Sequence, residues 1–111
     1  MKKLLIAGLA TAAMTSMAVA GSCSGTQCNG VKITEILATS AGTITVTTDA
    51  DESGLTCTTF GGKYVYIAAS APGKNALYSA LLTAKTTKNT VRLIMTPDSS
   101  GFCQITTLYV Q

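Results

Sequence analysis

The chain has 111 residues, of which 47% are hydrophobic and 12% are charged, and it contains no histidine. This length suits one domain with a small core. Its formal net charge of +3 falls to +1 without the first twenty residues, because Lys2 and Lys3 lie there and six basic residues then face five acidic ones. A nearly neutral chain with scattered basic residues does not attract nucleic acid, so we expect no nucleic-acid partner.

Residues 1–20 have the pattern of an export signal. The two lysines precede an uncharged run at residues 4–13, and residues 18–20 (AVA) form the small-x-small site that signal peptidase cuts. The apolar run is too short to cross ~30 Å of hydrocarbon. We therefore expect a mature chain that begins at Gly21, has no membrane span, and is periplasmic or secreted. The alternative is a lipid anchor on Cys23, although the bulky aliphatic residue usual three positions before a lipidated cysteine is absent.

Four cysteines follow the signal: Cys23, Cys28, Cys57 and Cys103. An even number in an exported chain favours two disulfides, and the lack of histidine and of paired C-x-x-C motifs argues against a metal site. Four cysteines allow three pairings. We favour Cys23 with Cys28, which closes a short Gly/Ser-rich loop, and Cys57 with Cys103, which joins the middle of the chain to its last strand.

The first half of the chain is expected to be β. Residues 21–30 (GSCSGTQCNG) lack periodicity and predict an N-terminal arm, so the domain itself spans residues 31–111. Residues 31–37 alternate as a strand that bends near its end. Residues 43–48 predict the next strand, with two aliphatic side chains on one face and threonines on the other.

An acidic segment follows at residues 49–54, which contains Asp49, Asp51 and Glu52. Three carboxylates so close together are compatible with calcium binding. However, the D-x-D-x-D-G spacing and the final glutamate of a calcium loop are absent. We therefore expect a solvated hairpin tip, without a bound metal or cofactor.

Residues 55–60 and 63–69 are also expected to be strands, separated by two glycines. Tyr64 and Tyr66 fall on one face of the second segment. Two tyrosines at a spacing of two can stack on a sugar ring, or they can pack a half-buried sheet face.

A helix is predicted next, with Asn75 as its N-cap and an apolar stripe that includes Leu77 and Leu81. Residues 91–96 and 102–110 then predict two final strands, joined by a turn. The resulting order is three or four strands, one helix and two strands. It matches a mainly β, five-stranded oligonucleotide/oligosaccharide-binding (OB) barrel (β-β-β-α-β-β), in which the helix lies between the third and fourth strands. The alternative is an α+β sandwich with the helix on one face.

Two segments carry a family resemblance. Residues 76–97, which read ALY, then TTKNTVRL, then a proline, resemble the helix-to-strand segment of the pentameric B subunits of subtilase-cytotoxin and pertussis-like toxins. Residues 29–35 (NGVKITE) look like their first strand. Those subunits are exported OB barrels that assemble as rings and bind sialylated glycans, so the resemblance implies a glycan-binding module in a homo-oligomeric ring. The chain also looks like short, uncharacterised exported proteins of Gram-negative bacteria.

The resemblance singles out one position in the first strand. In the toxins a serine that contacts sialic acid precedes the Gly-Val of that strand. Asn29 holds the matching position here, and its side chain can still hydrogen-bond a sugar. The resemblance therefore implies a role for Asn29 in ligand binding.

Catalysis is not expected. Without histidine a general base must be a carboxylate, and four of the five carboxylates fall in predicted loops while Glu35 has no evident partner. The cysteines are better used in disulfides than as nucleophiles. We predict a non-catalytic binding module for glycans, with Asn29, Tyr64 and Tyr66 as candidate ligand-binding residues. The alternative is a periplasmic or surface interaction protein with a protein partner and no small ligand. Convergence of these residues on a concave site would favour the first reading, and their dispersal would favour the second.

Overall fold

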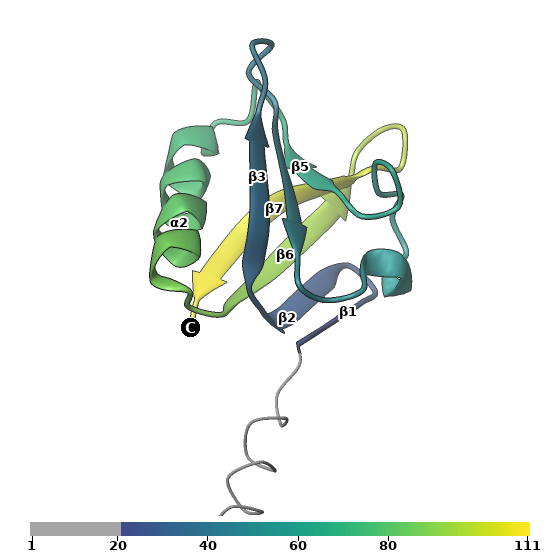
Figure 1. Ribbon diagram of the computed structural model, residues 1–111. Helices are drawn as coiled ribbons and strands as arrows, with labels where there is room; N and C mark the ends of the chain where they lie inside the picture. The colour runs from purple at the N-terminus through teal and green to yellow at the C-terminus, as the bar shows by residue number, and fades with distance from the viewer. Residues whose placement is uncertain (1–20) are drawn as a thin grey trace, which may run out of the picture.

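The computed structural model describes residues 21–111, so the predicted export signal lies outside the described residues. This part of the chain is mainly β, with one α-helix beside a sheet that curls into a half-barrel (Figure 1). The strands are β1 (Ser22–Ser24), β2 (Gln27–Val31), β3 (Ile33–Ala38), β4 (Ile44–Thr48), β5 (Val65–Ile67), β6 (Val91–Pro97) and β7 (Cys103–Val110). The 3-10 helix η1 (Glu52–Gly54) follows β4, and the helix α2 (Lys74–Thr87) follows β5.

The seven strands form one sheet in the order β1-β2-β6-β7-β5-β4-β3. Neighbours are antiparallel except β5 and β7, which pair in parallel at Tyr66 and Gln104. The two sides of this order are joined by a single residue, because Lys32 separates β2, which pairs with β6, from β3, which pairs with β4. The chain therefore bends at Lys32 and curls the sheet on itself.

Hydrogen bonds hold this bend. The backbone N–H of Lys32 donates to Oδ1 of Asp49 at 2.9 Å, and the backbone N–H of Asp49 donates to the carbonyl of Lys32 at 3.0 Å. Asp49 therefore holds the bend between β2, which pairs with β6, and β3, which pairs with β4.

Two predicted segments differ from the structure. Residues 21–30 form the β1–β2 hairpin rather than an irregular arm, and β2 pairs with β6. Cys23 and Cys28 lie directly opposite each other in this hairpin, and both are buried. Their disulfide fills the buried side of the hairpin, so the sequence shows no alternation of aliphatic and polar residues that would predict a strand. Residues 55–60 are not a regular strand, because they make isolated bridges at Leu55, Thr58 and Phe60. The seven strands thus replace the five expected.

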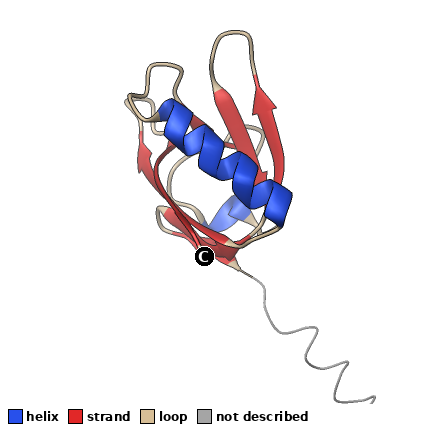
Figure 2. Ribbon diagram, turned by 90° about the vertical axis from the view of Figure 1, so that its left-hand side faces the viewer, coloured by secondary structure: helices blue, strands red, loops and turns tan. Residues whose placement is uncertain are grey.

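The helix is confirmed, and it covers the open side of the curled sheet (Figure 2). Leu81 and Ala84 are fully buried, while Leu77 packs half-buried against the core. The N-cap is Gly73 rather than Asn75, since the chain leaves β5 through a turn that ends in Pro72-Gly73. Lys88 ends the helix with φ 60°, and its N–H donates to the carbonyls of Ala84 and Lys85.

Both predicted disulfides are present: Cys23–Cys28 and Cys57–Cys103, with no free cysteine among residues 21–111. Two disulfides in a domain of this size are compatible with an oxidising compartment. No helix between residues 21 and 111 combines the length and apolar character needed to cross a bilayer.

Candidate functional site

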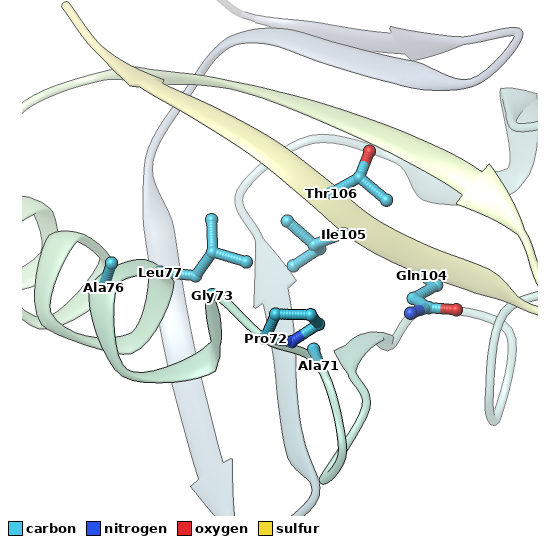
Figure 3. A pocket seen from close by; sticks show the side chains of 8 residues that line it. All are labelled: Ala71, Pro72, Gly73, Ala76, Leu77, Gln104, Ile105 and Thr106. Carbon is cyan, nitrogen blue, oxygen red and sulfur yellow. The ribbon is translucent and has the colours of Figure 1, made fainter.

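A cavity of about 340 Å³ lies between the start of α2 and β7 (Figure 3). Its lining is mostly apolar: Ala71, Pro72, Gly73, Ala76, Leu77 and Ile105, with Gln104 and Thr106 as the polar side chains. Ligand pockets usually measure ~300–1,000 Å³, so this cavity has room for a small group rather than for a large ligand.

Tyr66 lies on the strand beside Gln104, one of the residues that line this cavity. It lies directly opposite Gln104 in the parallel pairing of β5 and β7. Its neighbours Val65 and Ile67 are buried in the core, so Tyr66 projects from the opposite face of the strand and is half-buried there. Tyr64 follows the same alternation. The prediction that the two tyrosines share one face is consistent with this arrangement.

The tyrosines belong to a larger cluster, which we call the aromatic face: Phe60, Tyr64, Tyr66 and Phe102. The rings of Phe60 and Phe102 stack with their centroids 4.4 Å apart and an interplanar angle of 5°. The Tyr66 ring meets Phe60 edge-on at 5.4 Å and 77°. Phe60 nevertheless keeps 38% of its surface exposed. The aromatic face is therefore well packed and still accessible.

A disulfide and a short β-bridge position the stacked pair. Cys103 follows Phe102 in the chain, and its disulfide to Cys57 ties the segment that carries Phe60 to the start of β7. The backbone N–H of Cys103 donates to Thr58 at 2.8 Å, and that of Thr58 donates to Gly101 at 2.8 Å. Because covalent and backbone bonds hold both segments, the two phenylalanines keep their stacking without a regular strand beneath Phe60.

Two carboxylates flank the aromatic face. The Tyr64 hydroxyl donates to Oε1 of Glu35 at 2.8 Å, and the Tyr66 hydroxyl donates to Oδ2 of Asp98. The other oxygen of Asp98 accepts the backbone N–H groups of Ser100 at 2.8 Å and Phe102 at 2.9 Å. Asp98 thus orders the β6–β7 turn and orients Tyr66 at the same time.

These hydrogen bonds shift the titration of the residues that make them. Burial and the hydrogen bond to Asp98 raise the pKa of Tyr66 to about 12. The Tyr66 hydroxyl, helped by the backbone N–H of Phe102, lowers the pKa of Asp98. The hydrogen bond to Glu35 raises the pKa of Tyr64. At neutral pH both phenols therefore remain donors, and Asp98 remains a charged acceptor.

Asn29 does not join this group. It is exposed on β2, directly opposite Arg92 on β6, which in turn lies opposite Tyr109 near the end of β7. Tyr66 is registered with Gln104, five residues earlier on β7, which at ~3.3 Å per residue places the two positions roughly 17 Å apart along that strand. The three candidate residues therefore do not converge on one site: Tyr64 and Tyr66 share one face of the sheet, and Asn29 lies apart from them. This dispersal counts in favour of the interaction-protein alternative, and a sugar site can include only the two tyrosines among the three.

The acidic segment is not the solvated tip that we expected, because Glu52 is buried with 6% of its surface exposed. Its Oε2 accepts bonds from the Thr47 hydroxyl at 3.0 Å, the Thr48 hydroxyl at 2.9 Å and the Thr48 backbone N–H at 2.8 Å. Asp51 caps η1 through the backbone N–H of Ser53. The carboxylates of Glu52 and Asp51 thus stabilise the turn after β4 through hydrogen bonds. Residues 21–111 contain no cluster of potential metal ligands.

A second hollow, of about 320 Å³, lies near the end of α2 and is lined by Lys32, Ile33, Thr34, Asp49, Lys85 and Lys88. Three of its side chains are lysines, but Asp49 lies among them and the helix presents its electronegative C-terminal end here. Lys85 and Lys88 therefore lie where a positive charge is favourable, at the C-terminal end of the helix.

Our sequence reasoning missed Phe60 and Phe102, as well as the carboxylates that bind the tyrosines. One signal was present: Phe102 precedes Cys103 and Phe60 follows Cys57 by three positions, so the predicted disulfide already implied that the two rings lie near each other. The pairing of Glu35 with Tyr64 and of Asp98 with Tyr66 had no comparable signal, because both depend on strand register.

No protein-family model, curated protein or solved structure matches the chain significantly.

Proposed function

We propose that the chain is an exported, non-catalytic glycan-binding module whose sugar lies on the aromatic face. The observation that carries this proposal is the Phe60–Phe102 stack, which remains exposed beside two tyrosines whose hydroxyls are already bonded to carboxylates. A pyranose ring has an apolar C–H face and a polar rim. The C–H face packs on an aromatic ring, and the hydroxyl groups of the rim donate hydrogen bonds to carboxylates beside that ring.

Glu35 and Asp98 are suited to bind sugar hydroxyls. An ionised carboxylate offers about four acceptor positions. Oε2 of Glu35 accepts no bond from residues 21–111, and Oδ2 of Asp98 accepts the Tyr66 hydroxyl alone among them. Both carboxylates therefore keep acceptor capacity beside the rings, which supports recognition of neutral hydroxyl groups rather than of anions.

Pre-organisation further supports the proposal. Binding costs conformational entropy for every side chain that must be ordered, at ~0.5–1.5 kcal/mol for a flexible one. Here stacking, the Cys57–Cys103 disulfide and the hydrogen bonds to Asp98 have already ordered Phe60, Tyr66 and Phe102. A ligand would meet a surface that needs little adjustment, and the cavity that begins at Gln104 could hold a substituent of the sugar.

The strand arrangement supports an OB-like barrel as the finer description of the fold. Apart from β1 and β2, the chain order is β3-β4-β5-α2-β6-β7, with the helix between the third and fourth strands as in an OB fold. We propose that β2 and β3 together form its long, bent first strand, with Lys32 at the bend and β1 added as an N-terminal extension. On this description β2 closes the barrel by pairing with β6.

A binding titration tests the proposed function. We would screen the purified, disulfide-bonded protein on a glycan array and titrate it with the best glycan by NMR. Phe60→Ala should weaken binding at least tenfold, because it removes half of the stack. Leu82→Ala is the matched control, since it removes an apolar side chain of similar exposure from α2, 41% against 38% for Phe60, and should leave the affinity unchanged.

Two results would refute glycan binding on this surface: no glycan signal from a folded protein, or equal affinities for the Phe60→Ala and wild-type proteins. The first result would favour the other candidate, an interaction protein of the periplasm or cell surface.

A further inference from the structure

Arg92 is the single arginine of the sequence, and it lies outside the aromatic face. It is on β6, between Asn29 of β2 and Tyr109 of β7, and is directly opposite both in the strand register. Its guanidinium carbon lies 4.3 Å from the centre of the Tyr109 ring. Stacking on an aromatic ring, rather than an ion pair, therefore sets the position of the guanidinium.

The guanidinium has unused donors. Arginine carries five N–H groups in a planar fork, and among residues 21–111 none of them takes part in a hydrogen bond or salt bridge. Its Nε is buried and has no partner in this part of the chain. A buried donor without an acceptor is unfavourable, and native structures usually satisfy such groups through the chain, water or a ligand.

The acidic side chains among residues 21–111 have partners other than Arg92. Glu35 accepts from Tyr64 and Asp98 from Tyr66, while Glu52 accepts from two threonines. Asp49 holds the bend at Lys32, and Asp51 caps η1. None of these five carboxylates is bonded to Arg92, so its donors remain available to a ligand or to water.

The surroundings of Arg92 are accessible and polar. Tyr109 keeps 46% of its surface exposed, and Asn29 is exposed as well. The amide Nε2 of Gln111 donates to Oδ1 of Asn29 at 3.3 Å, which leaves the Nδ2 of Asn29 as a further donor. The group thus combines one charge, an amide donor and an exposed ring.

We propose that Arg92, Tyr109 and Asn29 form a binding site for a small carboxylate-bearing ligand. A carboxylate is planar and singly charged, and it matches a guanidinium fork better than a point charge would. Arg92 is the one cationic residue of the row that runs from Ser22 through Asn29 and Arg92 to Tyr109, which suits a monoanion rather than a polyphosphate. The carboxylate meets the terminal amino groups of Arg92, and the remainder of the ligand lies on Tyr109. This site is independent of the proposed sugar site on the aromatic face.

Having one arginine makes the test direct, because a ¹⁵N-labelled protein shows a single arginine Nε–H resonance. We would titrate the folded, disulfide-bonded protein with glucuronate, with glucose as its neutral counterpart, and with acetate. Glucuronate should shift this resonance saturably and glucose should not. An acetate shift with the same affinity would assign recognition to the carboxylate alone, and a weaker one would assign part of it to the ring on Tyr109; both support the site.

Variants separate a built site from general attraction between charges. Arg92→Lys keeps the charge but loses the fork and the stacking, and should weaken glucuronate binding at least tenfold. Lys85→Gln removes a positive charge from the exposed end of α2 and should leave the affinity unchanged. As a second measurement that needs no variant, glucuronate should protect Arg92 from phenylglyoxal in the wild-type protein, and glucose should not.

Several outcomes would overturn the inference: a lack of saturable shift with both carboxylates, an equal shift from chloride at matched ionic strength, equal losses for the two variants, or no protection. None of them bears on the aromatic face, which the Phe60→Ala titration tests separately.

Discussion

Phe102 stacks on Phe60 with a centroid distance of 4.4 Å, immediately before the cysteine that is bonded to Cys57. The disulfide and the stack therefore depend on each other. The disulfide limits how far the two segments can separate, and the stack fills the outer surface above it. This relationship ties the stability of the domain to the shape of the proposed sugar site.

The first prediction compares the two disulfides. In the loop-entropy model, Cys57–Cys103 stabilises the fold by roughly 4 kcal/mol and the short Cys23–Cys28 loop by roughly 2 kcal/mol. Replacing both cysteines of the long bridge by serine should lower the free energy of unfolding more than the same change in the short bridge, as measured by urea titration. It should also remove sugar binding, because Phe60 loses its anchor. A larger effect from the short bridge would contradict this ranking.

The second prediction concerns α2. Leu81 is completely buried, so Leu81→Ala should lower the free energy of unfolding by ~2–5 kcal/mol. Leu77 is half-buried, so Leu77→Ala should lower the free energy of unfolding by less. Lys85→Ala on the exposed face should leave it almost unchanged. Thermal and urea unfolding of the three variants would give the order. Similar small effects at all three positions would mean that the helix does not seal the core.

The third prediction concerns the buried carboxylate of Glu52. Glu52→Ala removes the acceptor for two hydroxyls and one backbone N–H, and each buried donor left without a partner costs ~1–3 kcal/mol. We expect a loss of at least about 2 kcal/mol in the free energy of unfolding. Ser53→Ala, at an exposed neighbour, is the control and should have little effect. A double-mutant cycle with Thr48→Val should show strong coupling, and additive effects would contradict the contacts.

The fourth prediction follows from the pKa of Tyr66, which is raised to about 12 in the folded chain. An unfolded tyrosine titrates near ~10, so the folded state holds the phenol proton more tightly. The associated stability is fully present below pH ~10 and is lost as the pH rises toward about 12. Absorbance of the phenolate should show a tyrosine that ionises near that pH. In Asp98→Asn the pKa should fall toward its ordinary value, and an unchanged titration would refute the role of Asp98.

The fifth prediction is that the protein assembles as a homo-oligomeric ring, as its resemblance to the toxin B subunits implies. Exposed strand edges favour pairing between copies, and a ring would raise the avidity of weak sugar sites without new contacts. Light scattering on the disulfide-bonded protein should then give a mass several times that of one chain. A monodisperse monomer would contradict the ring.

Elements with strong local patterns could be predicted from the sequence. The helix, β6 and β7 have clear periodicities, and the parity of the cysteines led to both disulfides. The β1–β2 hairpin could not be predicted in this way, because its two strands are short and Cys28 supplies much of its buried surface. The same limit applies to Glu52, whose burial depends on η1 folding back so that the Glu52 side chain meets Thr47 and Thr48 at the end of β4.

The positions of the candidate site residues depend partly on strand pairing, which the sequence pattern does not contain. Tyr64 and Tyr66 could be placed on a common face because alternation within one strand is a local property. The separation of Asn29 from them could not be anticipated, since it depends on β2 pairing with the distant strand β6. The partner of each tyrosine likewise follows from the register between distant strands.

The bend at Lys32 also has a consequence for how the chain folds. β3 and β4 can form a hairpin as soon as both exist, but β2 has to wait for β6, because Gln27 pairs with Ile94. Closure therefore joins the beginning of the domain to its last third, and such distant pairing is slow to form. The export that we propose requires the chain to cross a membrane before it folds. Late pairing of β2 with β6 would keep the chain unfolded until nearly all of it has emerged on the far side.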